Sequence, residues 1–305
     1  MATESLRALL LGAIDYAGLF PPASLALEPA LNNQAEYVHS PDAWLLGAFV
    51  LPVGKFDEAG AHLAGFDVEH RARISALGPK TDTPSDFIVA VSNVADAIRG
   101  LSTRHGAIAS VSQIEMPLAT QPGATIASAY DALDGLQIPA FWEAPPDEAE
   151  RAIATLAAHG RTYTGARFGF KLRTGGVVAS SFPSSMQIAR ALVAAAEHRV
   201  PIKFTAGLHH PIRQFHPSVQ TKMHGFLNVL GAGVLAAEYS WDQQQTAAML
   251  EDEDASSFVF SDESFRWREW QIAPERIRVQ RELVTSLGSC SFNDPREDLR
   301  ALNLF

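Results

Sequence analysis

From residue 43 to residue 208 the sequence alternates between short apolar runs and segments with helical spacing of apolar residues. The apolar runs predict buried strands at residues 43–52, 73–78, 107–118, 138–145, 166–172 and 201–208. Between them, helices are predicted at residues 85–101 (N-cap Ser85), 125–136, 147–160 (ended by Gly160) and 184–199. Apolar strands separated by helices are typical of a parallel sheet covered by helices. The number of units favours a (β/α)8 barrel over an open, doubly wound sheet.

The alternation is interrupted between residues 209 and 274. This segment contains two predicted helices, 224–239 and 243–254, followed by an aromatic and charged run at residues 258–270. A further helix and a last strand near residues 287–292 complete the pattern. We therefore predict a single α/β barrel domain over residues 1–305, with a mostly helical insertion at 209–274 before the last strand.

The charge and the cysteine content limit the partners and the compartment. The net charge of −10 argues against general nucleic-acid binding, which requires a basic surface. Because Cys290 is the one cysteine, no internal disulfide can form, and a reducing, cytoplasmic compartment is predicted. Asp15 interrupts the apolar N-terminal run, and no run approaches the roughly 20 apolar residues of a membrane span. The predicted partner is a small-molecule substrate, and a homo-oligomer is compatible with the sequence.

Two of the predicted strands carry a lysine near their ends. Lys171 lies in "GFKLRTGG", and Lys203 lies in "PIKFTAGL". A lysine in an apolar strand is unfavourable to bury unless it is paired or neutral, and the carboxyl ends of barrel strands surround one cavity. The two lysines would lower each other's pKa, and a neutral amine is the nucleophile that a Schiff base requires. In the structural alternative, both lysines form buried ion pairs with Glu115, Glu143 or Asp15.

These motifs resemble those of deoxyribose-phosphate aldolase, a class I aldolase family with a (β/α)8 barrel. "FKLRTGG" is similar to the family's Schiff-base strand. The resemblance implies that Lys171 forms the imine and that Thr174 and Gly175 take the places of the family's threonine and glycine. "IKFTAG" is similar to the family's next strand, in which a second lysine, here Lys203, perturbs the first.

Four further segments resemble the family in the same order along the chain. "AIDYAGLFPPAS" is similar to its opening strand and places Asp15 on the family's aspartate. "QIEMPL" places Glu115 on the aspartate of the proton relay, and "AFWEAP" ends in Glu143 where the family's strand also ends in a glutamate. "LGSCSF" is similar to the last strand, which ends in a phosphate-binding turn. The residues that match this turn in type are Gly288, Ser289 and Ser291.

The chain also departs from the family's pattern. Tyr16 and Ala17 replace a histidine and a threonine, and "AGLHHPIR" replaces the glycine-glycine-isoleucine-arginine turn of the phosphate site. Phe292 replaces the last glycine of the phosphate-binding turn, where a bulky side chain obstructs a phosphate. The resemblance therefore implies a carbonyl substrate but not a phosphorylated deoxysugar.

Four of the ten histidines lie in "GLHHPIRQFHPSVQTKMHG", at positions 209, 210, 216 and 224. They have three interpretations: a metal site, acid–base or anion-binding groups beside the lysines, or structural loop residues. Their spacing matches no standard metal signature. Because His209 and His210 are adjacent, at most one is expected to enter the pocket. Arg173 and Arg213 can each bind a carboxylate or a phosphate through two parallel hydrogen bonds.

The sequence thus predicts an aldolase-like lyase that acts on a small carbonyl substrate. Lys171 forms the Schiff base, Lys203 keeps Lys171 neutral, and Glu115 with Asp15 transfers protons. This mechanism needs no cofactor and no metal. The predicted substrate-binding residues are Arg173, Thr174, Gly175, Glu143, His209, His210, Gly288, Ser289 and Ser291.

Two alternatives use the same barrel. In the first, a metal-dependent lyase, isomerase or hydrolase uses histidine and carboxylate ligands, with Lys203 as the base. In the second, the altered phosphate-binding turn marks a barrel that has lost catalysis and binds a ligand or partner. Alanine at either lysine would then affect stability alone. Cys290 is interpreted as a small buried residue rather than a nucleophile.

Overall fold

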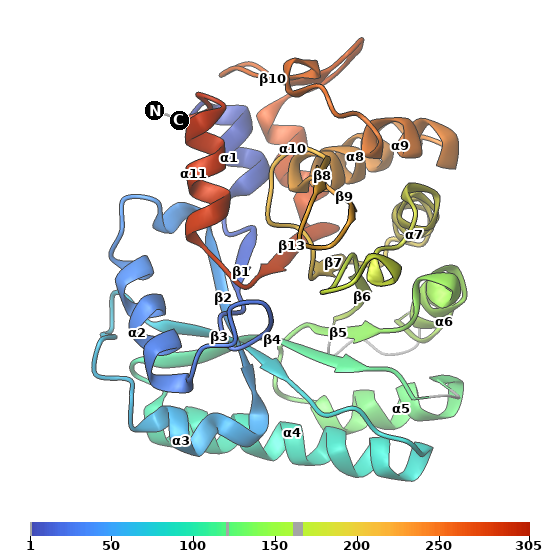
Figure 1. The fold of residues 1–305 in the computed structure, drawn as a ribbon. Helices are drawn as coiled ribbons and strands as arrows, with labels where there is room; N and C mark the ends of the chain where they lie inside the picture. The colour runs from blue at the N-terminus through green and yellow to red at the C-terminus, as the bar shows by residue number, and fades with distance from the viewer. Residues whose placement is uncertain (1, 120–121, 161–166) are drawn as a thin grey trace.

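The computed structural model describes residues 2–119, 122–160 and 167–305, and its centre is a closed barrel of eight parallel strands (Figure 1). Around the barrel the strands follow the order β1-β13-β7-β6-β5-β4-β3-β2. The expected (β/α)8 barrel is therefore confirmed, and closure removes the free edges of the sheet. The barrel strands are β1 (Ile14–Tyr16), β2 (Leu46–Pro52), β3 (Ala72–Leu77), β4 (Ala109–Pro117), β5 (Ala140–Glu143), β6 (Phe168–Arg173), β7 (Ile202–Thr205) and β13 (Val284–Ser289).

Helices form the outer layer of the molecule, and both chain ends lie on one side of it (Figure 1). Residues 161–166, the last of which is the expected first residue of the sixth strand, lie outside the described part of the chain. The helices are α1 (Glu4–Leu10), α2 (Leu27–Val38), α3 (Phe56–Gly60), α4 (Pro84–His105), α5 (Pro122–Leu133), α6 (Ala149–Gly160), α7 (Ser185–His198), α8 (Phe226–Tyr239), α9 (Gln243–Leu250), α10 (Pro274–Arg281) and α11 (Asn293–Ala301). Within the described residues, none of them has the length and apolar character needed to cross a membrane.

The start of α4 differs from the prediction by two residues. The hydroxyl of Thr83 accepts a hydrogen bond from the amide of Asp86, so Thr83, not Ser85, is the N-cap. Pro84 fits the first turn of the helix because an N–H group there has no partner within the helix. Further along α4, apolar side chains such as Phe87 and Val91 recur every three or four residues and are buried.

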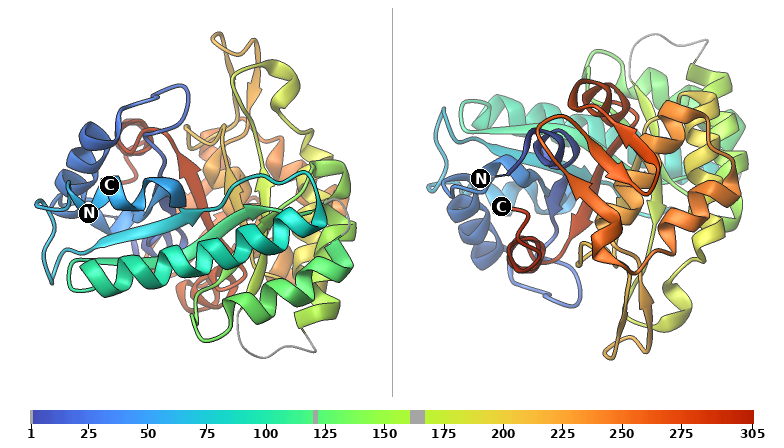
Figure 2. Two further views of the ribbon diagram at one scale, coloured as in Figure 1. Left: turned by 90° about the horizontal axis from the view of Figure 1, so that it is seen from below. Right: turned by 90° about the horizontal axis from the view of Figure 1, so that it is seen from above.

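The segment 209–274 lies between β7 and β13 and contains two small antiparallel sheets in addition to α8 and α9. β8 (Gln214–His216) and β9 (Thr221–Met223) form a hairpin that projects from the barrel beside the segment between β6 and α7 (Figure 2). β10 (Phe258–Phe260), β11 (Phe265–Trp267) and β12 (Trp270–Ile272) form the second sheet. Neither sheet was predicted, so the segment is less helical than expected.

Two boundaries near the C-terminal end also differ from the prediction. Helix α9 ends at Leu250 rather than at residue 254, because Asp252 is buried and accepts hydrogen bonds from Trp267 and Arg268. The last barrel strand ends at Ser289, three residues before the expected end at residue 292. The chain turns there, and Phe292 is the N-cap of α11, a helix that was not predicted.

Two glycines hold the ends of β6 and β7 together above the barrel. Gly207 has a φ of +77°, and a Cβ atom there would lie 2.9 Å from the Cα of Gly175 and 3.1 Å from the carbonyl oxygen of Thr174. Only glycine therefore allows the two backbones to approach this closely without strain. Thr174 strengthens the contact by donating from its hydroxyl to the carbonyl oxygen of Ala206, at 2.6 Å.

Gly207→Ala is expected to lower the free energy of unfolding by about 1–3 kcal/mol, because the left-handed backbone and the adjacent backbone atoms both oppose a methyl group. Gly54→Ala is the control, since nothing lies within 4 Å of a Cβ atom at that position. Urea unfolding of both variants measures the difference. Equal stability of the two variants would contradict the close approach.

Candidate active site

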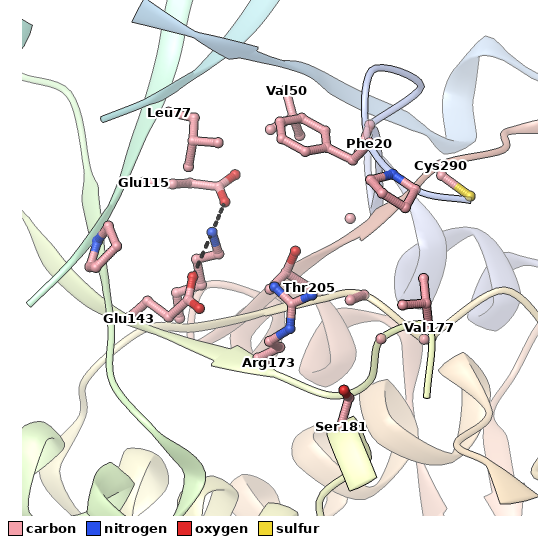
Figure 3. Close-up of a pocket in the computed structure, with 18 of the residues that line it drawn as sticks. Phe20, Val50, Leu77, Glu115, Glu143, Arg173, Val177, Ser181, Thr205 and Cys290 are labelled. Atoms are coloured by element: carbon pink, nitrogen blue, oxygen red, sulfur yellow. Dashed lines mark ion pairs between the residues drawn. The ribbon is translucent and has the colours of Figure 1, made fainter. Parts of the chain in front are cut away.

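A pocket of about 430 Å³ opens at the carboxyl ends of the barrel strands, where enzymes of this fold bind their substrates. Its wall is apolar on the side of β1 and β2, where Phe20 and Val50 lie (Figure 3). Pro21 and Pro22 also belong to the lining. Charged groups from β4, β5 and β6 line the opposite side. The charged residues of the lining, without histidine, are Lys80, Glu115, Glu143, Lys171 and Arg173.

The ammonium group of Lys171 lies between two carboxylates (Figure 3). Its Nζ atom is 2.8 Å from Oε2 of Glu115 and 2.9 Å from Oε2 of Glu143. In the sheet, Lys171 is paired in register with Glu143 on one side and with Lys203 on the other. Residues paired in register on parallel strands point to the same face, so these three side chains enter the barrel at one level.

Glu115 is shared by the two lysines. Its second oxygen, Oε1, contacts Nζ of Lys203 and accepts a hydrogen bond of 2.5 Å from the hydroxyl of Ser75. The carboxylate is 2% exposed. Burial disfavours its charged form, but Lys171 and Lys203 together outweigh burial, and the pKa of Glu115 is lowered well below its usual range. Glu115 is therefore an anion at neutral pH.

Lys203 does not make Lys171 neutral, which corrects the expectation from the sequence. Burial disfavours the charged form of Lys171, but the carboxylates of Glu115 and Glu143 outweigh burial and raise its pKa. The Glu115 carboxylate contacts the amine nitrogens of both Lys171 and Lys203. Its attraction to each lysine offsets the repulsion between the two. The buried ion pairs of the structural alternative are present, and the raised pKa favours the protonated form of Lys171 at neutral pH.

Asp15 lies below the pocket on β1 and links this strand to four others, β2, β4, β7 and β13. Its Oδ2 atom is 2.8 Å from Nζ of Lys203 and accepts hydrogen bonds from Gln113 and Ser286, while Oδ1 accepts one from the amide of Ala48. A Cβ atom on Gly47 would lie 2.2 Å from Oδ1, so a glycine is required at this point of β2. Asp15 is buried and does not line the pocket, which makes it a residue that positions Lys203.

Lys203 differs from Lys171 in its access to the pocket. The Lys203 side chain is completely buried, and only Lys171 of the two lines the pocket. With all groups ionised, the two lysines and Asp15, Glu115 and Glu143 carry one net negative charge. A reagent in the pocket can therefore reach the amine of Lys171 but not that of Lys203.

Arg173 and Lys80 form a basic side of the pocket. Both are exposed at its mouth. The Nε of Arg173 donates to the carbonyl oxygen of Gly175. Neither cation forms an ion pair with any residue that the structure describes. The sequence analysis named Arg173 but missed Lys80, whose signal was its position just after the third predicted strand. Two cations without a carboxylate partner provide a binding site for an anionic group.

Thr174 and Gly175, which the resemblance assigned to substrate binding, lie behind the pocket wall. Thr174 is fully buried and donates to the carbonyl oxygens of Thr205 and Ala206. Gly175 contacts the backbone of Gly207, as described above. Both residues fix the loop that follows Arg173 at the end of β6, and neither lines the pocket.

His209 and Cys290 share the rim of the pocket near β13. The Nδ1 atom of His209 lies 3.2 Å from Oγ of Ser289 and 3.9 Å from Sγ of Cys290. Burial, together with His210, lowers the pKa of His209, so its imidazole is neutral at pH 7. Burial also raises the pKa of Cys290, which keeps the thiol protonated. Cys290 lines the pocket, a position that the sequence analysis did not assign to it.

Of the other residues predicted to bind substrate, some line the pocket and some do not. Gly288 lines the pocket. Ser291 does not, because its hydroxyl donates to Asp294 and accepts from the amide of Asp294 at the start of α11. His210 points away from the pocket, and its Nδ1 lies 2.6 Å from Oδ2 of Asp298.

Of the four histidines of residues 209–224, His210 and His216 stack on each other, with ring centroids 5.3 Å apart, and His209 and His224 have other partners. His216 contacts Ser218, and His224 lies between the carbonyl oxygen of Pro183 and the guanidinium of Arg213. In the described part of the chain, no group of three histidine, cysteine or acidic side chains in this segment or in the pocket has donor atoms close enough for one metal ion. This arrangement favours the lysine-based interpretation over the metal-dependent alternative.

The fold and the site together define a (β/α)8 barrel with a charged pocket at the carboxyl ends of its strands. No protein-family model matches the chain, and no curated protein matches it. The function therefore has to be argued from the groups in the pocket.

Proposed function

We propose that the protein is a class I aldolase-like lyase in which Lys171 forms a Schiff base with a small carbonyl compound. The observation that supports this most directly is the position of Lys171: a buried lysine with its amine in a pocket, held between two carboxylates. Such carboxylates can accept and return the protons that imine formation requires. The resemblance to deoxyribose-phosphate aldolase points to the same lysine.

Imine formation begins with a proton transfer. Glu143 is the acceptor, because its side chain is 23% exposed and reaches the pocket, whereas Glu115 is held by Lys203 and Ser75. The neutral Lys171 amine attacks the carbonyl carbon and forms a carbinolamine. Glu143 then returns a proton to the hydroxyl group, which leaves as water, and an iminium ion remains.

The iminium ion is the electron sink for the bond-breaking step. When the bond between the α and β carbons of the imine breaks, its electron pair forms an enamine and the iminium nitrogen becomes neutral. The hydroxyl group on the β carbon gives its proton to the Glu143 carboxylate, and this fragment leaves as an aldehyde or ketone. Protonation of the enamine and hydrolysis by water release the product and restore Lys171. Glu115 stays ionised throughout and stabilises the positive charge on the Lys171 nitrogen. Lys203 and Asp15 act through Glu115 as positioning residues.

The substrate carries an anionic group, for which we propose a carboxylate. Arg173 lies two residues after Lys171 on β6, so the two side chains point to the same face. The planar guanidinium group matches a carboxylate through two parallel hydrogen bonds, and Lys80 adds a second positive charge. His209 and Gly288 line the same pocket and complete the site.

Borohydride trapping tests this function. The purified protein is incubated with pyruvate, glyoxylate and their methyl esters, then reduced, and the intact mass and the modified peptide are determined. We expect one adduct per chain on Lys171, formed to a greater extent with the acids than with the neutral esters. Arg173→Ala should remove this preference, and Arg99→Ala, which removes an exposed arginine on α4, should keep it.

The outcomes separate the two parts of the proposal. An adduct on Lys171 without a preference for the acids would refute the anionic substrate but not the imine. Absence of any adduct across a broad panel of aldehydes, ketones and ketoacids would refute the imine. That result would favour the binding barrel, in which the same ion pairs are structural.

A further inference from the structure

A second group of chemically active side chains lies at the opposite end of the barrel from the pocket. His39 is the C-cap of α2, and Asp67 and His70 lie in the turn that precedes β3. Their potential ligand atoms all lie within 4.8 Å of one another. The proposed lyase does not use these residues, and the sequence analysis did not name them, because His39 is far from the other two in sequence.

The backbone holds each member of this cluster in place. The Oδ1 atom of Asp67 accepts hydrogen bonds from the amides of Glu69 and His70, at 2.8 and 2.6 Å. The amide of Asp67 donates to the carbonyl oxygen of His70, which closes the turn. The amide of His39 donates to the carbonyl oxygen of Glu36 at the end of α2. The three side chains therefore start from fixed positions.

The two imidazole rings face each other without a mutual hydrogen bond. Their centroids are 4.2 Å apart, with an angle of 49° between the planes. The Nδ1 atom of His70 is buried and has no hydrogen-bond partner. The nearest carboxylate oxygen of Asp67 lies 3.4 Å from it. Two imidazoles and one carboxylate whose ligand atoms lie this close together can all donate electron pairs to one ion.

We propose that His39, Asp67 and His70 bind a divalent first-row transition metal, with zinc as the best match. Two imidazole nitrogens and one carboxylate oxygen are a common ligand set for zinc, and water completes a tetrahedron. Donor atoms at zinc bond lengths are about 3.3 Å apart in a tetrahedron. The ligand atoms lie within 4.8 Å of one another, so small rotations of these partly exposed side chains bring them to that spacing. The metal would join the end of α2 to the turn before β3 and stabilise the fold.

Metal titration of the intact protein tests this site. The protein is treated with chelator, dialysed and titrated with Zn²⁺ by calorimetry and with Co²⁺ by visible absorption. We expect one ion per chain, the visible bands of tetrahedral cobalt, and a rise in Tm on the order of 5 °C at saturating Zn²⁺. His39→Ala and His70→Ala should each abolish binding and the Tm shift.

His216→Ala is the matched control. The rings of His216 and His210 stack on each other, so these two residues are a second pair of neighbouring histidines, away from the proposed site. This variant should leave binding unchanged. Asp67→Asn retains the shape of the turn and should weaken binding at least tenfold while the chelated protein keeps its circular dichroism spectrum. The proposal is overturned if no ion binds at 1 mM Zn²⁺, or if binding survives in His39→Ala and His70→Ala.

Discussion

Replacing Lys171 with methionine is expected to abolish the borohydride-dependent adduct and to reduce turnover of any substrate found by at least about a thousandfold. Methionine keeps the unbranched apolar stem of lysine but has no amine to attack a carbonyl. Stability should change less than activity. Glu115 keeps Lys203 and Ser75 as partners, and Glu143 is exposed enough to be solvated by water. Intact-mass spectrometry after reduction measures the adduct.

Lys203→Met is the matched control for this experiment. It removes the same functional group from the neighbouring strand, at a position paired in register with Lys171 but closed off from the pocket. We expect this variant to retain the adduct on Lys171, at a reduced rate, because Glu115 loses one of its two cations. Loss of the adduct in the Lys203 variant but not in the Lys171 variant would contradict the assignment.

Glu115→Gln is expected to lower the free energy of unfolding by about 3 kcal/mol. Removing one partner of a buried ion pair usually costs about 3–5 kcal/mol. We expect the lower end of this range because Lys171 keeps Glu143 and Lys203 keeps Asp15 as partners. Urea unfolding measures the change. Glu148→Gln, which breaks an exposed pair with Arg151, should lower the free energy of unfolding by less than about 1 kcal/mol.

The effect of Glu115→Gln has a defined pH dependence. Folding lowers the pKa of Glu115, so its contribution to stability is complete above the pKa of an unfolded glutamate, about 4.3. That contribution is lost as the pH falls through the lower, folded-state pKa. The difference between wild type and variant should therefore shrink in acid. A difference that grows below pH 4 would contradict the ion-pair geometry.

The barrel itself was predictable because its signal repeats along the chain. Continuous apolar strands between helices leave few alternatives, and the chain order of the barrel strands matches the prediction. The small sheet β10–β12 was not predicted, although Phe265, Arg266 and Trp267 alternate between buried and exposed. That alternation covers only three residues, which is too short to predict a strand within an aromatic and charged run. The end of α9 depends on Asp252, which is held by hydrogen bonds from Trp267 and Arg268. The end of β13 depends on the turn into α11, whose N-cap is Phe292.

The candidate site was predictable in its composition but not in its electrostatics. Polar residues at the ends of apolar runs identified Lys171, Glu115 and Glu143, which the barrel brings together. Sequence order could not show that Glu115 lies between the two lysines, and this placement reverses the direction of the expected pKa shift. Cys290 lies within the segment "LGSCSF", but its place in the pocket lining was not predicted, because it depends on where β13 ends.

The contacts of Asp15 also determine when the barrel can be completed. Its partners lie on strands synthesised at very different times, and Ser286 is 271 residues away along the chain. Until the ribosome has released Lys203 and Ser286, the Asp15 carboxylate cannot be buried without losing two of its four hydrogen bonds. Contacts of such high sequence separation form late and slow the folding of the whole domain. Strand β1 is thus the first barrel strand to leave the ribosome and among the last that can be buried.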